Sequence, residues 1–276
     1  MGTTDRVALI TGCGKAIGIG AASARALAAS GVSVVVTDVA ARGVANAHDA
    51  QTDMDPSWRG LETLVEQITA AGGKASWTNG DVTSEADAAR MVGYTLEKYG
   101  RLDILVNNAG APHGKDRAPI EEVPVEAWDL LMGINAKGTF LMSRAAVTPM
   151  REQGWGRIIN MSSAAAKYGR KNRALYSASK AAIVGFTHSL GVELAPYGIT
   201  VNAICPGPIL TARALSSARR ESGSSETAAG LADRASRIPV GRHGRPEEIA
   251  GMVMYLASDA SAFVTGQAIS VCGGTT

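Results

Sequence analysis

Short runs of β-branched and other apolar residues alternate along this chain with longer, alanine-rich stretches whose apolar residues recur at helical spacing. The runs have the length and composition of strands, and they span residues 7–11, 32–37, 74–78, 104–107, 157–161, 200–204 and 268–271. The helical stretches lie between them, at about 18–30, 60–71, 84–99, 126–153, 174–196 and 246–258. Apolar strands that alternate with helices are typical of a parallel sheet covered on both faces. With right-handed crossovers, the pattern predicts an α/β fold, a single Rossmann-like, doubly wound, parallel seven-stranded sheet with helices on both faces.

Two segments interrupt this alternation within the single domain that we expect to span residues 1–276. Residues 39–60 are polar and long for a connection between a strand and a helix, which indicates an insertion or a frayed extra helix. Residues 210–237 are rich in alanine, serine and arginine and are interpreted as a mobile helical flap over the substrate. For both segments the alternative is surface decoration without a role.

Composition narrows the class of partner. Lys and Arg number 27 against 25 Asp and Glu, and this near balance gives no reason to expect nucleic acid or an anionic membrane as a partner. The apolar runs are far shorter than the ~20 residues needed to cross a bilayer. The polar start of the chain lacks the apolar stretch of a signal peptide. We therefore expect no membrane association and a cytoplasmic location.

Cysteine and histidine usage gives no sign of a disulfide framework or a metal centre. The cysteines are odd in number, far apart and without a CxxC pair, which is typical of reduced cytosolic thiols: Cys13, Cys205 and Cys272. The histidines lack the spacing of metal ligands: His48, His113, His188 and His243.

A glycine-rich run, residues 11–20, joins the first strand to the first helix. Glycines at such a turn let the backbone approach a pyrophosphate, and the helix N-terminus supplies N–H donors. The strict G-x-G-x-x-G spacing is absent, so a simple tight turn is the alternative. Asp38 ends the second strand 20 residues beyond Gly18, where a carboxylate would bind the ribose hydroxyls of NAD and repel the 2′-phosphate of NADP. Lys15 favours NADP instead; we expect Asp38 to prevail, and hence NAD.

Tyr176 and Lys180 stand four residues apart, on one face of a predicted helix. A free tyrosine has a pKa of roughly 10. A neighbouring ammonium favours the phenolate and lowers that pKa, which makes tyrosine a general acid or base near neutrality. Taken alone, this pair also fits a solvated helix face.

Together these motifs resemble the short-chain dehydrogenase/reductase family, and the resemblance runs from Arg6 to Gly274. The family's cofactor turn, Thr-Gly-x-x-x-Gly-x-Gly, is similar to residues 11–18, with Ala16 in place of the middle glycine, where its methyl group would crowd the pyrophosphate. Cys272 stands where the family usually has aspartate. The resemblance implies a cofactor site formed by Gly12, Lys15, Ile17, Gly18, Asp38, Asp81, Val82, Asn108, Ala109, Gly110, Tyr176, Lys180, Pro206, Gly207, Ile209 and Thr211.

The same resemblance implies a catalytic tetrad of Asn135, Ser163, Tyr176 and Lys180, in which Ser163 lies 13 residues before Tyr176 and Ser162 is the less favoured serine. In the mechanism that it implies, Tyr176 transfers the hydroxyl proton while a hydride moves between substrate carbon and nicotinamide. Lys180 lowers the pKa of Tyr176 and binds the nicotinamide ribose, and Ser163 orients the substrate oxygen. Asn135 holds a water that links Lys180 to solvent.

Cationic side chains are frequent in three segments that would border the substrate. The stretch after Ser163 contains Lys167, Arg170, Lys171 and Arg173, and the loop after Gly110 contains His113, Lys115 and Arg117. The flap contains Arg213, Arg219 and Arg220. One hypothesis is that they select an anionic alcohol or carbonyl substrate. The alternative is a solvated surface or one between subunits.

We therefore expect an NAD(H)-dependent oxidoreductase that interconverts a secondary alcohol and a ketone. The first alternative is an NADP(H)-dependent carbonyl or 3-oxoacyl reductase, which shares the tetrad. The second is a non-catalytic dinucleotide sensor or scaffold, although such proteins usually lose a tetrad residue. The resemblance further implies a homo-oligomer, a tetramer or a dimer.

Overall fold

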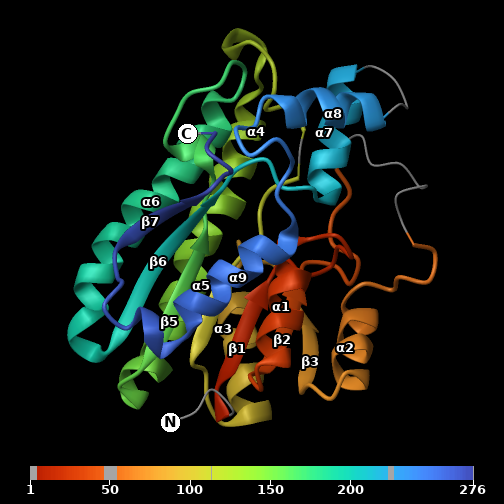
Figure 1. The fold of residues 1–276 in the computed structure, drawn as a ribbon. Coiled ribbons are helices and arrows are strands. Elements are labelled where there is room, and N and C mark those ends of the chain that lie inside the picture. The colour runs from red at the N-terminus through yellow and green to blue at the C-terminus, as the bar shows by residue number, and fades with distance from the viewer. Residues whose placement is uncertain (1–4, 47–54, 113, 223–226, 276) are drawn as a thin grey trace.

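A parallel sheet in the order β3-β2-β1-β4-β5-β6-β7 runs through the centre of the molecule (Figure 1). The computed structural model describes residues 5–46, 55–112, 114–222 and 227–275. Each strand lies within two residues of its predicted bounds, so the predicted fold class is confirmed: β1 Val7–Thr11, β2 Ser33–Asp38, β3 Ala75–Asn79, β4 Ile104–Asn107, β5 Gly156–Met161, β6 Ile199–Pro206 and β7 Gln267–Val271.

Alternate side chains of the strands pack into two apolar layers, because successive residues of a strand point to opposite faces. On one face, Ile10 and the other strand residues that point to the same side pack against α1 (Ile19–Ala29), α2 (Leu61–Ala70) and α9 (Pro246–Ala257). On the other face, Leu9 and the other strand residues that point to that side pack against α3 (Glu85–Tyr99), α5 (Gly138–Gln153) and α6 (Ala174–Leu194). None of the described helices is both long and apolar enough to cross a membrane.

The order in which successive strands are added to the sheet reverses between β1 and β4. It first adds β2 and β3 on one side of β1, then returns to place β4 on the other side. The two connections leave β1 and β4 in opposite directions, which opens a crevice beyond the carboxyl ends of these strands. The glycine-rich turn after β1 and the turn after β4 both lie there.

The stretch predicted as one helix over 126–153 is interrupted. The structure has α4 (Val125–Leu131), a π-helical segment over Met132–Lys137, and then α5. A π-helical turn inserts an extra residue into the i→i−4 ladder and is frequent at functional sites. Periodicity alone did not reveal this, because the apolar pattern continues through the segment. Asn135 lies inside it.

The two interrupting segments differ in structure. In the flap, α7 (Ala212–Ser222) and α8 (Thr227–Ser236) pack on each other at the end of the sheet where the strands terminate (Figure 1). The predicted helical character of the flap is therefore present, and its mobility stays a prediction. In the insertion, residues 47–54 lie outside the described residues, and the described parts on either side form turns and bends without a helix.

Candidate active site

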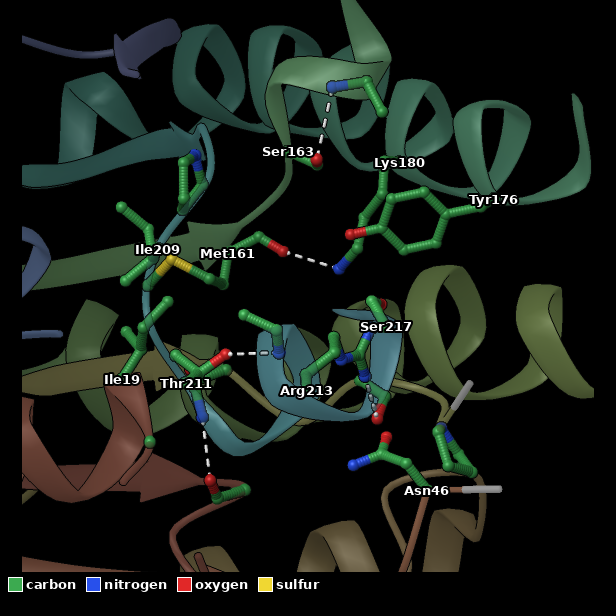
Figure 2. A pocket seen from close by; sticks show the side chains of 18 of the residues that line it. Ile19, Asn46, Met161, Ser163, Tyr176, Lys180, Ile209, Thr211, Arg213 and Ser217 are labelled. Carbon is green, nitrogen blue, oxygen red and sulfur yellow. Dashed lines mark hydrogen bonds between the residues drawn. The ribbon is translucent and has the colours of Figure 1, made fainter. Parts of the chain in front are cut away.

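A cleft of about 1110 Å³ opens beyond the carboxyl ends of the strands (Figure 2). Its walls come from the turns after β1, β2, β4 and β6, from the start of α6 and from α7. All the residues predicted to hold the cofactor line this one cleft, as do Ser163, Tyr176 and Lys180. The structure thus brings together side chains that are up to about 200 positions apart in the sequence, and what they bind stays a prediction.

The glycine-rich turn is bonded to the turn after β4. Gly12 has a φ of +73°, and a Cβ there would lie 2.7 Å from the Cα of Ala109, so only glycine fits. The Asn108 side chain donates to the carbonyl oxygens of Thr11 and Gly12, both at 2.9 Å. No side chain caps α1 at Gly18, so the first N–H groups of this helix face the cleft without a side-chain acceptor.

Ala16, which replaces the family's middle glycine, does not lie on the wall of the cleft. It packs against the apolar layer that α1, α2 and α9 share with the sheet. The expected crowding of the pyrophosphate by this methyl group stays a prediction.

Asp38 closes the end of the cleft next to β2. One carboxylate oxygen accepts from the backbone N–H of Gly14 and the other from its neighbour Val39, both at 2.9 Å. Burial raises the pKa of Asp38, and these two bonds and the charge of Lys15 oppose that rise. Each carboxylate oxygen can accept more than one hydrogen bond, so Asp38 keeps acceptor capacity for ribose hydroxyls.

Trp58, from the insertion, supports the glycine-rich turn from behind. Its ring is 5% exposed, and its Nε1 donates to the carbonyl oxygen of Gly14 at 2.9 Å. Nearby, Gly60 has a φ of +84°, and a Cβ there would lie 1.9 Å from the carbonyl oxygen of Ala41. The insertion is thus folded tightly onto the cofactor turn, which sequence analysis missed because the partner of Trp58 is 44 positions away.

Trp58→Phe is expected to weaken cofactor binding by about 3- to 10-fold, the equivalent of one lost hydrogen bond. NADH fluorescence titration measures this affinity. Trp155→Phe is the matched control, because Trp155 stacks on Arg6 and Arg157 away from the cleft. Equal affinities in the two variants and the unaltered protein would contradict a supporting role for Trp58.

Tyr176 and Lys180 lie one turn apart at the start of α6 and both reach the cleft (Figure 2). Lys180 is 4% exposed, and its Nζ lies 6.0 Å from the centre of the Tyr176 ring and donates to the carbonyl oxygen of Met161 at 2.9 Å. The Ser163 hydroxyl lies near Tyr176 and helps to lower the pKa of its phenol. The Ser162 hydroxyl is instead turned to the carbonyl oxygen of Lys180, at 2.8 Å, which supports Ser163 as the relevant serine.

Opposing effects set the pKa of Tyr176. Burial by itself would raise it, but the charges of Lys180, Arg213 and Arg117 and the hydrogen bond with Ser163 together lower the pKa below its ordinary value. Burial also lowers the pKa of Lys180, while the interaction with Tyr176 opposes this. A half-buried phenol with a depressed pKa beside a buried ammonium is suited to proton transfer near neutrality.

Asn135 lies behind the cleft and not on its wall. It is fully buried; its Oδ1 accepts from the backbone N–H of Ala111 at 3.0 Å, and its Nδ2 donates to Ser179 Oγ at 2.9 Å. These bonds tie the π-helical segment to α6 and to the loop after β4. The water that we expect Asn135 to hold stays a prediction.

Arg213 is a site residue that sequence analysis placed only among the cations of the flap. It lies in the first turn of α7, and its guanidinium donates to the carbonyl oxygens of Gly110, at 3.2 Å, and Ala111. It lies on the far side of the cleft from α6, across from Lys180 (Figure 2). Its sequence neighbours gave no signal, because the contact spans more than 100 positions.

Comparison with known proteins agrees with this geometry. A family model described as enoyl-(acyl carrier protein) reductase matches residues 12–276. An uncharacterized oxidoreductase of Thermotoga maritima is 41% identical over 277 residues, which cover 100% of this chain and 99% of that protein. A 3-oxoacyl-(acyl-carrier-protein) reductase of Synechocystis sp. is 36% identical, and the match covers 98% of this chain and 97% of that protein. A cis-4-hydroxycyclohexanecarboxylate dehydrogenase of Sinomonas cyclohexanicum is 37% identical, and the match covers 99% of this chain and 97% of that protein.

A solved structure resembles this one over nearly its whole length. A variant of the actinorhodin polyketide ketoreductase, crystallised with NADPH, superimposes on this structure with a TM-score of 0.85 at 36% sequence identity. The match covers 99% of this chain and 98% of the ketoreductase chain. The sheet order, the dinucleotide cleft and the similarity along the full chain lead to the same assignment. This protein is an enzyme of the short-chain dehydrogenase/reductase family, an oxidoreductase that acts on CH–OH groups.

Proposed function

We propose that this enzyme interconverts a secondary alcohol and a ketone with NAD(H), and that Tyr176 exchanges the hydroxyl proton. The observation that carries the proposal is the group of Tyr176, Lys180 and Ser163 in one wall of the cleft, with the pKa of Tyr176 lowered by its neighbours. In oxidation the alcohol loses its O–H proton to the Tyr176 phenolate and its carbinol hydrogen as a hydride. In reduction both return.

Each polar side chain has a distinct task in this proposal. The Ser163 hydroxyl orients the substrate oxygen and stabilises the charge that develops on it. Lys180 keeps Tyr176 available as a phenolate by its charge. Asn135 fixes the loop at Ala111 relative to α6 through its two side-chain hydrogen bonds. The nicotinamide supplies the hydride chemistry, and the protein supplies orientation and electrostatics.

The cofactor end of the cleft fits a dinucleotide. The turn at Gly12 lets the backbone come close, and the N-terminus of α1 offers N–H donors to a pyrophosphate. We propose NAD because the Asp38 carboxylate lines the cleft at the end of β2, where it accepts ribose hydroxyls and repels a 2′-phosphate. NADP(H) is the second candidate, favoured by Lys15 in the same wall and by the NADPH of the similar ketoreductase.

Titration of the purified enzyme with NADH and with NADPH at fixed salt distinguishes these candidates. NADH is expected to bind at least about tenfold more tightly, since Asp38 and a 2′-phosphate repel each other. Asp38→Asn is expected to remove most of this preference, and a thermal melt checks that the variant folds. Tighter NADPH binding by the unaltered enzyme would instead identify an NADP(H)-dependent carbonyl or 3-oxoacyl reductase.

The predicted homo-oligomer stays a proposal. Large apolar side chains are exposed on α4, α5 and α6, among them Val125, Phe140 and Val192. Light scattering of the purified enzyme measures the state directly.

A further inference from the structure

The ionisable side chains of the cleft are separated by sign of charge. Among the described residues that line it, the only carboxylates are Asp38 and Asp81, which belong to the predicted adenosine end beyond β2 and β3. The other end, around Tyr176, is lined by cations without a lining carboxylate: Arg117, Arg170, Lys171, Arg173, Arg213, Arg234 and Arg237. A wall of one charge raises the local concentration of ligands of the opposite charge.

Three of these cations are directed elsewhere. Arg237 pairs with Asp233 at 2.6 Å. Arg170 donates to the Tyr168 hydroxyl at 2.7 Å, and Arg234 donates to the carbonyl oxygen of Ser217 at 2.9 Å. These contacts account for their placement without a ligand.

Arg213 is directed toward the reacting group. Among the described residues, only one of its terminal nitrogens bonds to protein, to the carbonyl oxygens of Gly110 and Ala111. A guanidinium has five N–H donors, and no described residue accepts a hydrogen bond from the Nε or the other terminal nitrogen of Arg213. No described carboxylate forms a salt bridge with it either. Its charge reaches both Tyr176 and Lys180.

Arg117 brings a second positive charge to the same place. Its guanidinium carbon lies 5.9 Å from the centre of the Tyr176 ring, and its side chain is only 2% exposed. Asp116 lies 3.7 Å from its Nε and offsets part of its charge. Arg117 therefore adds to the positive electrostatic field around Tyr176, while Arg213 has the N–H donors for direct contact with a ligand.

We infer that Arg213 is a substrate-binding residue and that the substrate is a hydroxy acid, or the matching keto acid, whose carboxylate lies beside the reacting carbinol carbon. The planar fork of arginine matches the two oxygens of a carboxylate with parallel hydrogen bonds. The inference rests on the proposed function, because it places the carboxylate relative to Tyr176.

Binding to the cofactor-loaded enzyme tests this without turnover. Cyclohexanecarboxylate and its uncharged carboxamide are titrated by calorimetry in the presence of NAD. The carboxylate is expected to bind at least about tenfold more tightly than the amide, and Arg213→Gln is expected to abolish the difference. Arg237→Gln is the matched control: it removes a cation from the same cleft, and we expect it to leave the difference intact.

Turnover supplies the second test. Pairs such as 2-hydroxycyclohexanecarboxylate and its carboxamide are compared as the ratio of kcat/KM for the charged and the neutral member. The influence of Arg213 on the pKa of Tyr176 acts equally on both members and cancels in this ratio. We expect the ratio to exceed about ten and to fall toward one in Arg213→Gln.

The outcomes separate the inference from the proposed function. Neutral alcohols that bind and react as well as their acids, or a ratio that Arg213→Gln leaves unchanged, would overturn the inference while the proposed function stands. An equal loss in Arg237→Gln would show a general field effect and also overturn it. Failure to oxidise any alcohol with either nucleotide would refute the proposed function itself, while the calorimetric comparison still decides whether the cleft binds a carboxylate.

Discussion

Replacing Tyr176 by phenylalanine is expected to lower kcat by about 10²- to 10⁴-fold, the usual contribution of general acid–base catalysis. The variant keeps the ring and its packing against Ala111, Ala127 and Leu131, but it has no hydroxyl to exchange a proton. Affinity for the nicotinamide cofactor is expected to stay within about threefold of the unaltered enzyme, because Tyr176 would contribute one hydrogen bond of many to the dinucleotide.

Steady-state rates and a cofactor titration on the same preparation measure both effects. Tyr168→Phe is the matched control, since Tyr168 also lines the cleft but its hydroxyl bonds to Arg170. Unchanged turnover in Tyr176→Phe would exclude this tyrosine as the proton-exchanging group.

Lys180→Met is expected to reduce alcohol oxidation at neutral pH by about 10- to 10³-fold. The ammonium is among the charges that lower the pKa of Tyr176, and an opposite charge at this range shifts a pKa by about 1–3 units. Without it the pKa of Tyr176 rises, so a smaller fraction is phenolate at a given pH. The rate of oxidation should then rise with pH over a higher range than in the unaltered enzyme, and raising the pH should restore part of the activity.

A pH–rate profile for oxidation measures this displacement. Lys167→Met is the matched control, because Lys167 bonds to the carbonyl oxygen of Ala268 and to Ser270 and is not among the charges that act on Tyr176. A Lys180→Met profile that loses height but keeps its pH range would mean that Lys180 positions a ligand and does not set the pKa of Tyr176.

Local sequence patterns predicted the sheet, and together with the family resemblance they indicated the core of the site. The five inner strands β1, β2, β4, β5 and β6 are largely buried on both faces, and burial of this kind leaves an apolar pattern independent of the rest of the chain. Tyr176 and Lys180 share a face because a helix brings every fourth residue into line, whatever surrounds it. The turn at Gly12 needs a positive φ, which is a property of the residue itself.

Only the tertiary structure decided which distant segments complete the cleft. Trp58 reaches Gly14 from an insertion, Arg213 reaches Gly110 from the flap, and Asn135 lies in a π-helical segment between α4 and α5. Such contacts depend on how long connections fold back over the sheet. The neighbouring sequence does not identify these partners, because each of the three side chains bonds to at least one backbone carbonyl or N–H group, which nearly every residue carries.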